Sequence, residues 1–98
     1  MKHPLKPPDA RREIGRVLRE GAISWDPSPR SHFLQELEND QMCMADCMNV
    51  LRGGMPDPAE WNDSFEEFRY RVHTMKFCVV CVFASDDESF LVTAWRKK

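Results

Sequence analysis

The chain has 98 residues and a formal net charge of −2, and 42% of its residues are hydrophobic. This length fits one small domain, this hydrophobic share excludes a disordered chain, and this charge argues against indiscriminate binding to nucleic acids. The charge is unevenly spread, because residues 67–98 carry six basic against four acidic side chains while the acid excess lies earlier. A partner of the last third would therefore meet a locally basic surface.

The amino-terminal segment, residues 1–8, contains three prolines and lacks the apolar stretch of a signal peptide. We expect it to form a flexible tail ahead of a single domain at residues 9–98. The longest apolar run, residues 77–84, is too short to span a bilayer. We therefore expect a cytoplasmic protein whose four cysteines are reduced.

Three helices are predicted in the first half of the chain. The first covers residues 9 to 19 or 20, with Asp9 as its N-cap and Gly21 as its left-handed stop. The second is expected at residues 30–38 and the third at residues 44–52, just before two glycines. Apolar spacing predicts inward faces made of Ile14, Val17 and Leu18, then Phe33, Leu34 and Leu37, then Met44, Cys47, Met48 and Leu51.

Three strands are predicted in the last third, at about residues 66–74, 76–84 and 89–96. A tight step at Met75 and an acidic turn at residues 85–88 make them consecutive antiparallel hairpins. The middle strand is apolar on both faces, which is typical of a central strand.

Helices followed by a run of strands define an α+β domain. We expect N-terminal helices packed on a C-terminal three- to four-stranded antiparallel sheet. A short edge strand is expected at residues 22–25 and a loop at residues 55–64, which holds two prolines.

The cysteines offer two candidate metal-binding spacings, Cys43 with Cys47 and the C-x-x-C of Cys78 and Cys81. Residues three apart in a strand point to opposite faces, so the sulfurs of the second pair cannot share one zinc ion. The same geometry argues against a thioredoxin-type redox pair. We therefore expect reduced core cysteines, no metal and no cofactor.

The strand at residues 66–74 alternates apolar and basic side chains, so that Arg69, Arg71 and His73 share one face. A solvated face with cross-strand charge pairs would accommodate this row. The row also suits a phosphodiester, because arginine forks bind phosphate oxygens and histidine can move protons.

Residues outside this strand are compatible with both the solvated face and the phosphodiester site. Thr93 and Trp95 share a face of the last strand, whose basic end continues with Arg96 and Lys97. A tryptophan near arginines can stack on an unpaired base, or it can belong to the core. His32, at the start of the second helix, is either a capping or half-buried structural group or a titrating one.

Five segments carry a family resemblance: Ser31-His32-Phe33-Leu34, Met48 to Gly54, Phe68 to His73, Cys78-Val79-Val80, and Val92-Thr93-Ala94-Trp95-Arg96. Over roughly residues 22–96 they resemble small bacterial proteins of the domain of unknown function 4258 family. The order of elements is also similar to that of the motility quorum-sensing regulator toxin and, more distantly, of the RelE-like toxins.

The resemblance implies a RelE-like fold and a metal-independent endoribonuclease toxin that cleaves messenger RNA. Its implied partners are RNA and an antitoxin protein, often one with a zinc-binding domain and a helix-turn-helix. It implies no membrane partner and allows a homodimer.

The resemblance also assigns residues. His32 matches the histidine of the family's S-x-H-A motif, Arg69 and Arg71 match its basic strand, and the closing T-x-W-R is matched by Thr93, Trp95 and Arg96. Of the Lys, Gln and Tyr set of the quorum-sensing toxin, this sequence offers only Tyr70, Lys76 and the terminal lysines, including Lys97.

Cleavage of RNA without metal needs a base for the 2′-hydroxyl, positive charge at the phosphorus and an acid for the leaving oxygen. We expect His73 or His32 to act as base or acid, and Arg69, Arg71 and Arg96 to stabilise the transition state. RNA-binding roles are expected for Tyr70, Lys76, Thr93, Trp95 and Lys97. The alternative is a non-catalytic module of the same fold that binds a protein through a strand edge, or binds RNA without cleaving it.

Overall fold

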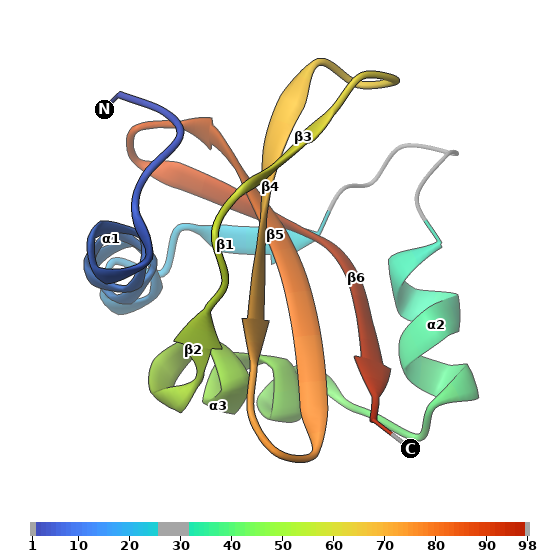
Figure 1. Ribbon diagram of the computed structural model, residues 1–98. Helices are drawn as coiled ribbons and strands as arrows, with labels where there is room; N and C mark the ends of the chain where they lie inside the picture. The colour runs from blue at the N-terminus through green and yellow to red at the C-terminus, as the bar shows by residue number, and fades with distance from the viewer. Residues whose placement is uncertain (1, 26–31, 98) are drawn as a thin grey trace.

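The computed structural model describes residues 2–25 and 32–97, and this part of the chain forms three helices and a six-stranded sheet (Figure 1). The elements are α1 (Pro7–Arg19), β1 (Ile23–Trp25), α2 (Phe33–Asn39), α3 (Met44–Gly53), β2 (Met55–Pro56), β3 (Glu60–Asn62), β4 (Glu67–His73), β5 (Phe77–Ser85) and β6 (Glu88–Arg96). The predicted α+β class is confirmed. None of the helices in these two stretches combines the length and the apolarity that crossing a bilayer requires.

The sheet has the strand order β1-β6-β5-β4-β2, and β3 also pairs with β4. The antiparallel meander of β4, β5 and β6 follows the predicted strands to within about a residue at each end. The predicted edge strand is present as β1, but it runs parallel to β6. The sheet therefore exceeds the expected three to four strands, and it is mixed rather than purely antiparallel.

The segment at residues 55–64 was expected to be a loop, and this prediction is wrong. Met55 and Pro56 pair with the end of β4, and residues 60–62 pair with its beginning. Two short strands thus share one edge of β4. Proline is tolerated at an edge because its missing N–H removes no bond from the interior of the sheet.

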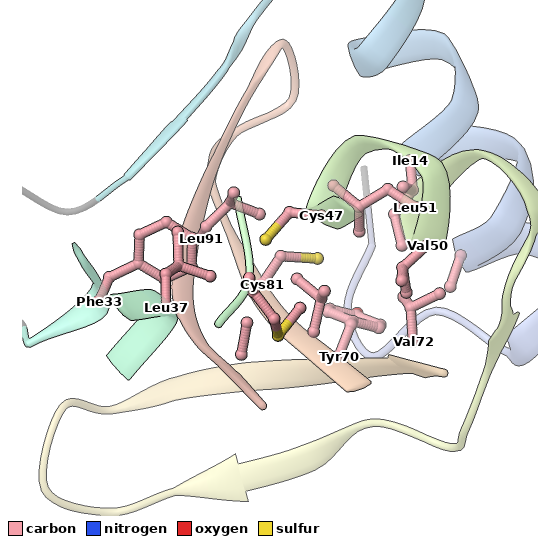
Figure 2. Close-up of a cluster of buried hydrophobic side chains, with 14 residues drawn as sticks. Ile14, Phe33, Leu37, Cys47, Val50, Leu51, Tyr70, Val72, Cys81 and Leu91 are labelled. Carbon is pink, nitrogen blue, oxygen red and sulfur yellow. The ribbon is translucent and has the colours of Figure 1, made fainter. Parts of the chain in front are cut away.

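One sheet face is buried against α1 and α3. Tyr70 and Val72 of β4 point into this core together with Val79 and Cys81 of β5. Figure 2 shows Tyr70, Val72 and Cys81 beside the inward residues of the two helices, which include Ile14, Cys47, Val50 and Leu51. Burying side chains of this size stabilises the fold by about 1.5–3 kcal/mol each.

Helix α2 packs on β6 and extends the core past the edge of the sheet (Figure 1). Its buried residues are Phe33 and Leu37, whereas Leu34 is 52% exposed, so its predicted inward orientation is wrong. The reason is that α2 covers a single strand and buries only one row of its side chains. The predicted helix start, residues 30 and 31, lies outside the described residues.

Helix α1 begins earlier than expected. Lys6 is its N-cap, and Pro7 and Pro8 occupy the first helical positions, where a missing N–H costs nothing. Asp9 therefore lies in the first turn, where it forms an ion pair with Arg12. The segment before the helix lies against the sheet, because the Tyr70 hydroxyl accepts the backbone N–H of Leu5 and contacts the His3 ring.

A β-bulge changes the phase of β6. Val80 is the partner of Thr93, but the next residue, Cys81, is the partner of Leu91. One extra residue in β6 therefore lets Leu91 and Ala94 both face the core while Thr93 and Trp95 share the opposite face.

Gly54, directly after α3, brings the backbone close to β4. A Cβ atom at this position would lie 2.5 Å from the Val50 carbonyl oxygen and 2.9 Å from the His73 carbonyl oxygen. We predict that Gly54→Ala lowers the free energy of unfolding by about 1–3 kcal/mol, because backbone atoms must shift. Thermal or denaturant unfolding measures this loss.

The matched control is Gly53→Ala, one residue earlier. A Cβ atom there would meet nothing within 4 Å. Alanine also favours the helical conformation over glycine, so we expect unchanged or slightly higher stability, by less than about 1 kcal/mol. Equal destabilisation by both substitutions would contradict the close-approach interpretation.

His3 makes stability depend on pH. Burial lowers the pKa of His3 below its usual value, and the nearby charge of Asp86 only partly opposes this. The neutral ring is therefore the form that the folded state prefers, so its contribution is complete above about pH 6.5 and is lost as the pH falls. We predict that His3→Ala flattens the decline in unfolding free energy between about pH 7 and 5. Parallel pH profiles for both proteins would contradict this.

Candidate functional site

The basic row of β4 lies on the sheet face opposite the α1–α3 core, as predicted. We call this surface the open face and define it by Arg69, Arg71 and His73 of β4 and by Thr93 and Trp95 of β6. The register brings these strands together, since Arg71 is the partner of Val80 on β5, and Val80 is the partner of Thr93. The side chains of β4 and β6 therefore meet above the apolar residues of β5.

Arg69 is held by acidic and aromatic neighbours. Its Nε donates to the Glu67 carboxylate at 3.1 Å, and its guanidinium lies 5.2 Å from the centre of the Phe65 ring. Both partners of the ion pair are only about a quarter exposed. Arg69 is therefore the most firmly fixed cation of the row.

Arg71 forms one wall of a groove. Its guanidinium lies over the Trp95 ring, 5.5 Å from the ring centre, and one of its terminal nitrogens is 3.9 Å from a Glu60 oxygen. The groove has a volume of about 170 Å³ and is lined by Glu60, Trp61, Asn62, Arg69, Arg71, Val80, Thr93 and Trp95. We call it the β3–β6 groove. The cation stacked on the Trp95 ring forms one of its walls, and the buried Val80 lies on its floor.

His73 lies between a carboxylate and an ammonium group. Its Nε2 is 2.9 Å from an Asp57 oxygen, and its Nδ1 is 3.2 Å from the Lys97 Nζ. A neutral ring that donates from Nε2 to Asp57 and accepts at Nδ1 from Lys97 satisfies both contacts. Asp57 thereby fixes the tautomer and orientation of the ring, as carboxylates do beside catalytic histidines.

The acidic partners do not make the cations inaccessible. Arg71 and Glu60 are 45% and 70% exposed, and their distance is at the limit of an ion pair. Ion pairs this exposed contribute about 0–1 kcal/mol. A phosphate that accepts two parallel hydrogen bonds from a guanidinium can displace such a carboxylate.

A second hollow borders the open face on the side of α2. It has a volume of about 250 Å³ and is lined in part by Glu36, Asp40, Thr93 and Trp95. The Thr93 hydroxyl donates to the Glu36 carboxylate. This hollow is acidic, so the positive part of the open face is confined to the side of β4.

Arg96 does not belong to the open face. Its backbone N–H donates to the Asp40 side chain at 2.8 Å, and its guanidinium donates to the carbonyl oxygens of Asp40 and Gln41. It also lies 4.9 Å from the centre of the Phe77 ring. These bonds cap the carboxyl end of α2, where a cation is stabilised by unpaired carbonyl groups.

Three further predicted site residues also lie elsewhere. Tyr70 is fully buried, and its hydroxyl is bonded near the amino terminus. His32 is exposed at the N-cap of α2, whereas Arg96 caps the opposite, carboxyl end of that helix. Lys76 is exposed in the turn between β4 and β5 and lines an apolar hollow with Met75 and Phe77.

The cysteines divide between the faces as the spacing argument predicted. Cys81 belongs to the core, whereas Cys78 is the strand partner of His73 and Trp95 and lies beneath the open face. Burial raises the pKa of Cys81 to about 12 and also raises that of Cys78, so neither thiol is a nucleophile near neutral pH. Within residues 2–25 and 32–97, no three His, Cys, Asp or Glu side chains are grouped to hold a metal ion.

Asp57 and Glu60 were missed by the sequence interpretation, as were Trp61 and Asn62. All four lie in the segment that was expected to be a loop. The Asp57 backbone N–H donates to the Arg71 carbonyl oxygen, which places the carboxylate beside His73. The alternation of Glu60, Trp61 and Asn62 was the available signal for a short strand.

Stability measurements can separate the structural role of Arg96 at the end of α2 from the role of Arg71 on the open face. We predict that Arg96→Ala lowers the free energy of unfolding by about 1–3 kcal/mol, because two carbonyl groups at the end of α2 lose their donors. The matched substitution Arg71→Ala removes one ion pair 3.9 Å long and no bond to a helix end, so it should cost less than about 1 kcal/mol. Denaturant unfolding measures both, and equal losses would show that Arg96 is not a structural clamp.

Comparisons of the chain with protein-family models, with curated proteins and with solved structures give no match. The family resemblance therefore stays a prediction that rests on the quoted segments. What the open face does is inferred from its own side chains.

Proposed function

We propose that the open face binds single-stranded RNA and cleaves it without a metal ion, as an endoribonuclease toxin would. One observation carries this proposal: His73 is held between Asp57 and Lys97, next to the stacked pair of Arg71 and Trp95. An oriented imidazole, an ammonium group, a guanidinium and an aromatic ring are together the groups that this reaction needs.

Proton transfer starts at His73. When Lys97 moves from the ring towards the bound phosphate, Nδ1 becomes able to take the proton of the ribose 2′-hydroxyl. The 2′-oxygen then attacks phosphorus, the bond to the 5′-oxygen breaks, and the Lys97 ammonium gives its proton to that oxygen. The products are a 2′,3′-cyclic phosphate and a 5′-hydroxyl. Water carries the proton from His73 back to Lys97.

Asp57 and Arg71 stabilise the charges that develop in this step. Asp57 faces Nε2, so its negative charge favours the imidazolium that forms when Nδ1 is protonated. Arg71 gives the pentavalent phosphorus a positive partner after it exchanges Glu60 for phosphate oxygens. Trp95 stacks on an adjacent base and holds the strand in place.

The wider proposal follows the resemblance stated from the sequence. It includes a RelE-like arrangement of helices and meander, a cytoplasmic location where messenger RNA is translated, and an antitoxin that covers the open face. The three strands of the meander and the helix that precedes them are compatible with that arrangement.

The test is cleavage of single-stranded RNA by purified protein in excess EDTA, with the product ends identified. We expect cyclic phosphate ends for the wild type, a rate loss of about 10²–10⁴-fold for His73→Ala, and a smaller loss for Asp57→Asn. His32→Ala is the matched control, because it removes an exposed histidine away from the open face, and its rate should equal that of the wild type. Undiminished cleavage by a folded His73→Ala protein would refute the assignment.

A non-catalytic binding module is the second candidate. It is favoured by the acidic partner that each of Arg69, Arg71 and His73 carries, because paired charges suit a protein or RNA surface that only docks. RNA binding without cleavage by the wild type would identify this module.

A further inference from the structure

We propose that the β3–β6 groove is a pocket for a guanine base, and that Glu60 selects guanine over the other bases. This inference rests on the proposed binding of single-stranded RNA to the open face, but it does not require cleavage. It assigns a specificity role to a residue of β3.

The groove has the construction of a base pocket. Val80 lies on its floor, and the stacked Arg71 and Trp95 form one flat wall. Aromatic rings and arginine planes are the surfaces on which unpaired bases stack. Its volume of about 170 Å³ suits one planar group rather than a longer segment.

Polar atoms along β3 are arranged to read the edge of such a base. Glu60 and Asn62 are two residues apart in the strand and so lie on the same side of it, and both line the groove. The Asn62 side-chain oxygen accepts the backbone N–H of Phe65 at 3.0 Å, which turns its amide nitrogen into the group that can donate. The pocket edge therefore offers a carboxylate acceptor and an amide donor.

This combination matches guanine. The Watson–Crick edge of guanine presents two neighbouring donors, N1–H and the N2 amino group, beside the O6 acceptor. The Glu60 carboxylate accepts both donors at once, and the Asn62 amide can donate to O6. Arg71 also contributes positive charge on the side of the phosphate.

The other bases fit the carboxylate poorly. Adenine and cytosine place a ring nitrogen acceptor next to their single amino group, so that one carboxylate oxygen faces a lone pair. Uracil offers one N–H between two carbonyl groups, which repel a carboxylate. A mismatch of this kind discriminates between bases, because a polar group is left without its bond.

Glu60 is able to take this role. Its side chain is 70% exposed, and its contact with Arg71 is 3.9 Å long, so it can rotate towards a base without breaking a strong interaction. Glu67 is the natural comparison on the same face, since its carboxylate is held by Arg69 at 3.1 Å.

The experiment measures affinity for short 2′-O-methyl oligouridines that carry one central guanine, adenine or cytosine. These RNAs cannot be cleaved by 2′-hydroxyl attack, so binding is read separately from turnover. Fluorescence polarisation should give guanine a preference on the order of ten- to a hundredfold. Glu60→Gln should abolish the preference, Glu67→Gln should keep it, and thermal unfolding should verify that both variants are folded.

Each outcome decides between the proposals. Equal affinity for the three oligonucleotides, or a preference that survives in Glu60→Gln, would overturn the pocket even if natural RNA is cleaved. A guanine preference lost only in Glu60→Gln would establish the pocket even if natural RNA is not cleaved, and only the nuclease proposal would then fail.

Discussion

The side chains of β4 are divided between two environments that exclude each other. Tyr70 and Val72 are almost fully buried against the helices, and the strand geometry then forces Arg69, Arg71 and His73 to the opposite surface. A shift of one residue would bury two arginines and a histidine, at a cost that a domain of this size cannot bear. The core therefore fixes the position of the basic row as firmly as it fixes its own packing.

The acidic residues around this row explain how an acidic chain can carry a basic surface. Asp57, Glu60 and Glu67 each contact one member of the row, and all three come from the segment that runs along one edge of β4 or from β4 itself. The pairs hold the cations in defined directions, and the more exposed pairs are weak enough to exchange for phosphate. The basic row can therefore be neutralised by its own carboxylate partners in the free protein and still attract a polyanion.

The sequence was sufficient for features that depend on local periodicity. Alternation in residues 66–74 identified both faces of β4, and the apolar run at 77–84 identified the central strand. It was insufficient where the role of a residue depends on a contact with a residue far away in the sequence. Tyr70 and Arg96 have side chains of a kind that binds RNA. However, the Tyr70 hydroxyl is buried and accepts the backbone N–H of Leu5, and the Arg96 guanidinium donates to a carbonyl oxygen at the end of α2. The edge strands in residues 55–64 have only two and three residues, so their weak alternation does not distinguish them from a loop, and their pairing with β4 is what defines them.

The bulge in β6 has a consequence for how this protein can change over evolutionary time. Because Val92 is the extra residue of the bulge, loss of its codon would leave a regular ladder in which Leu91 still faces the core and Thr93 the open face. An added codon elsewhere in β6 would instead reverse the inward-outward phase of the residues beyond it. The exposed turn at residues 63–66 has no such phase to preserve. Insertions among homologues should therefore accumulate in that turn and be rare in the paired part of β6, whereas β6 itself can vary in length by one residue at Val92.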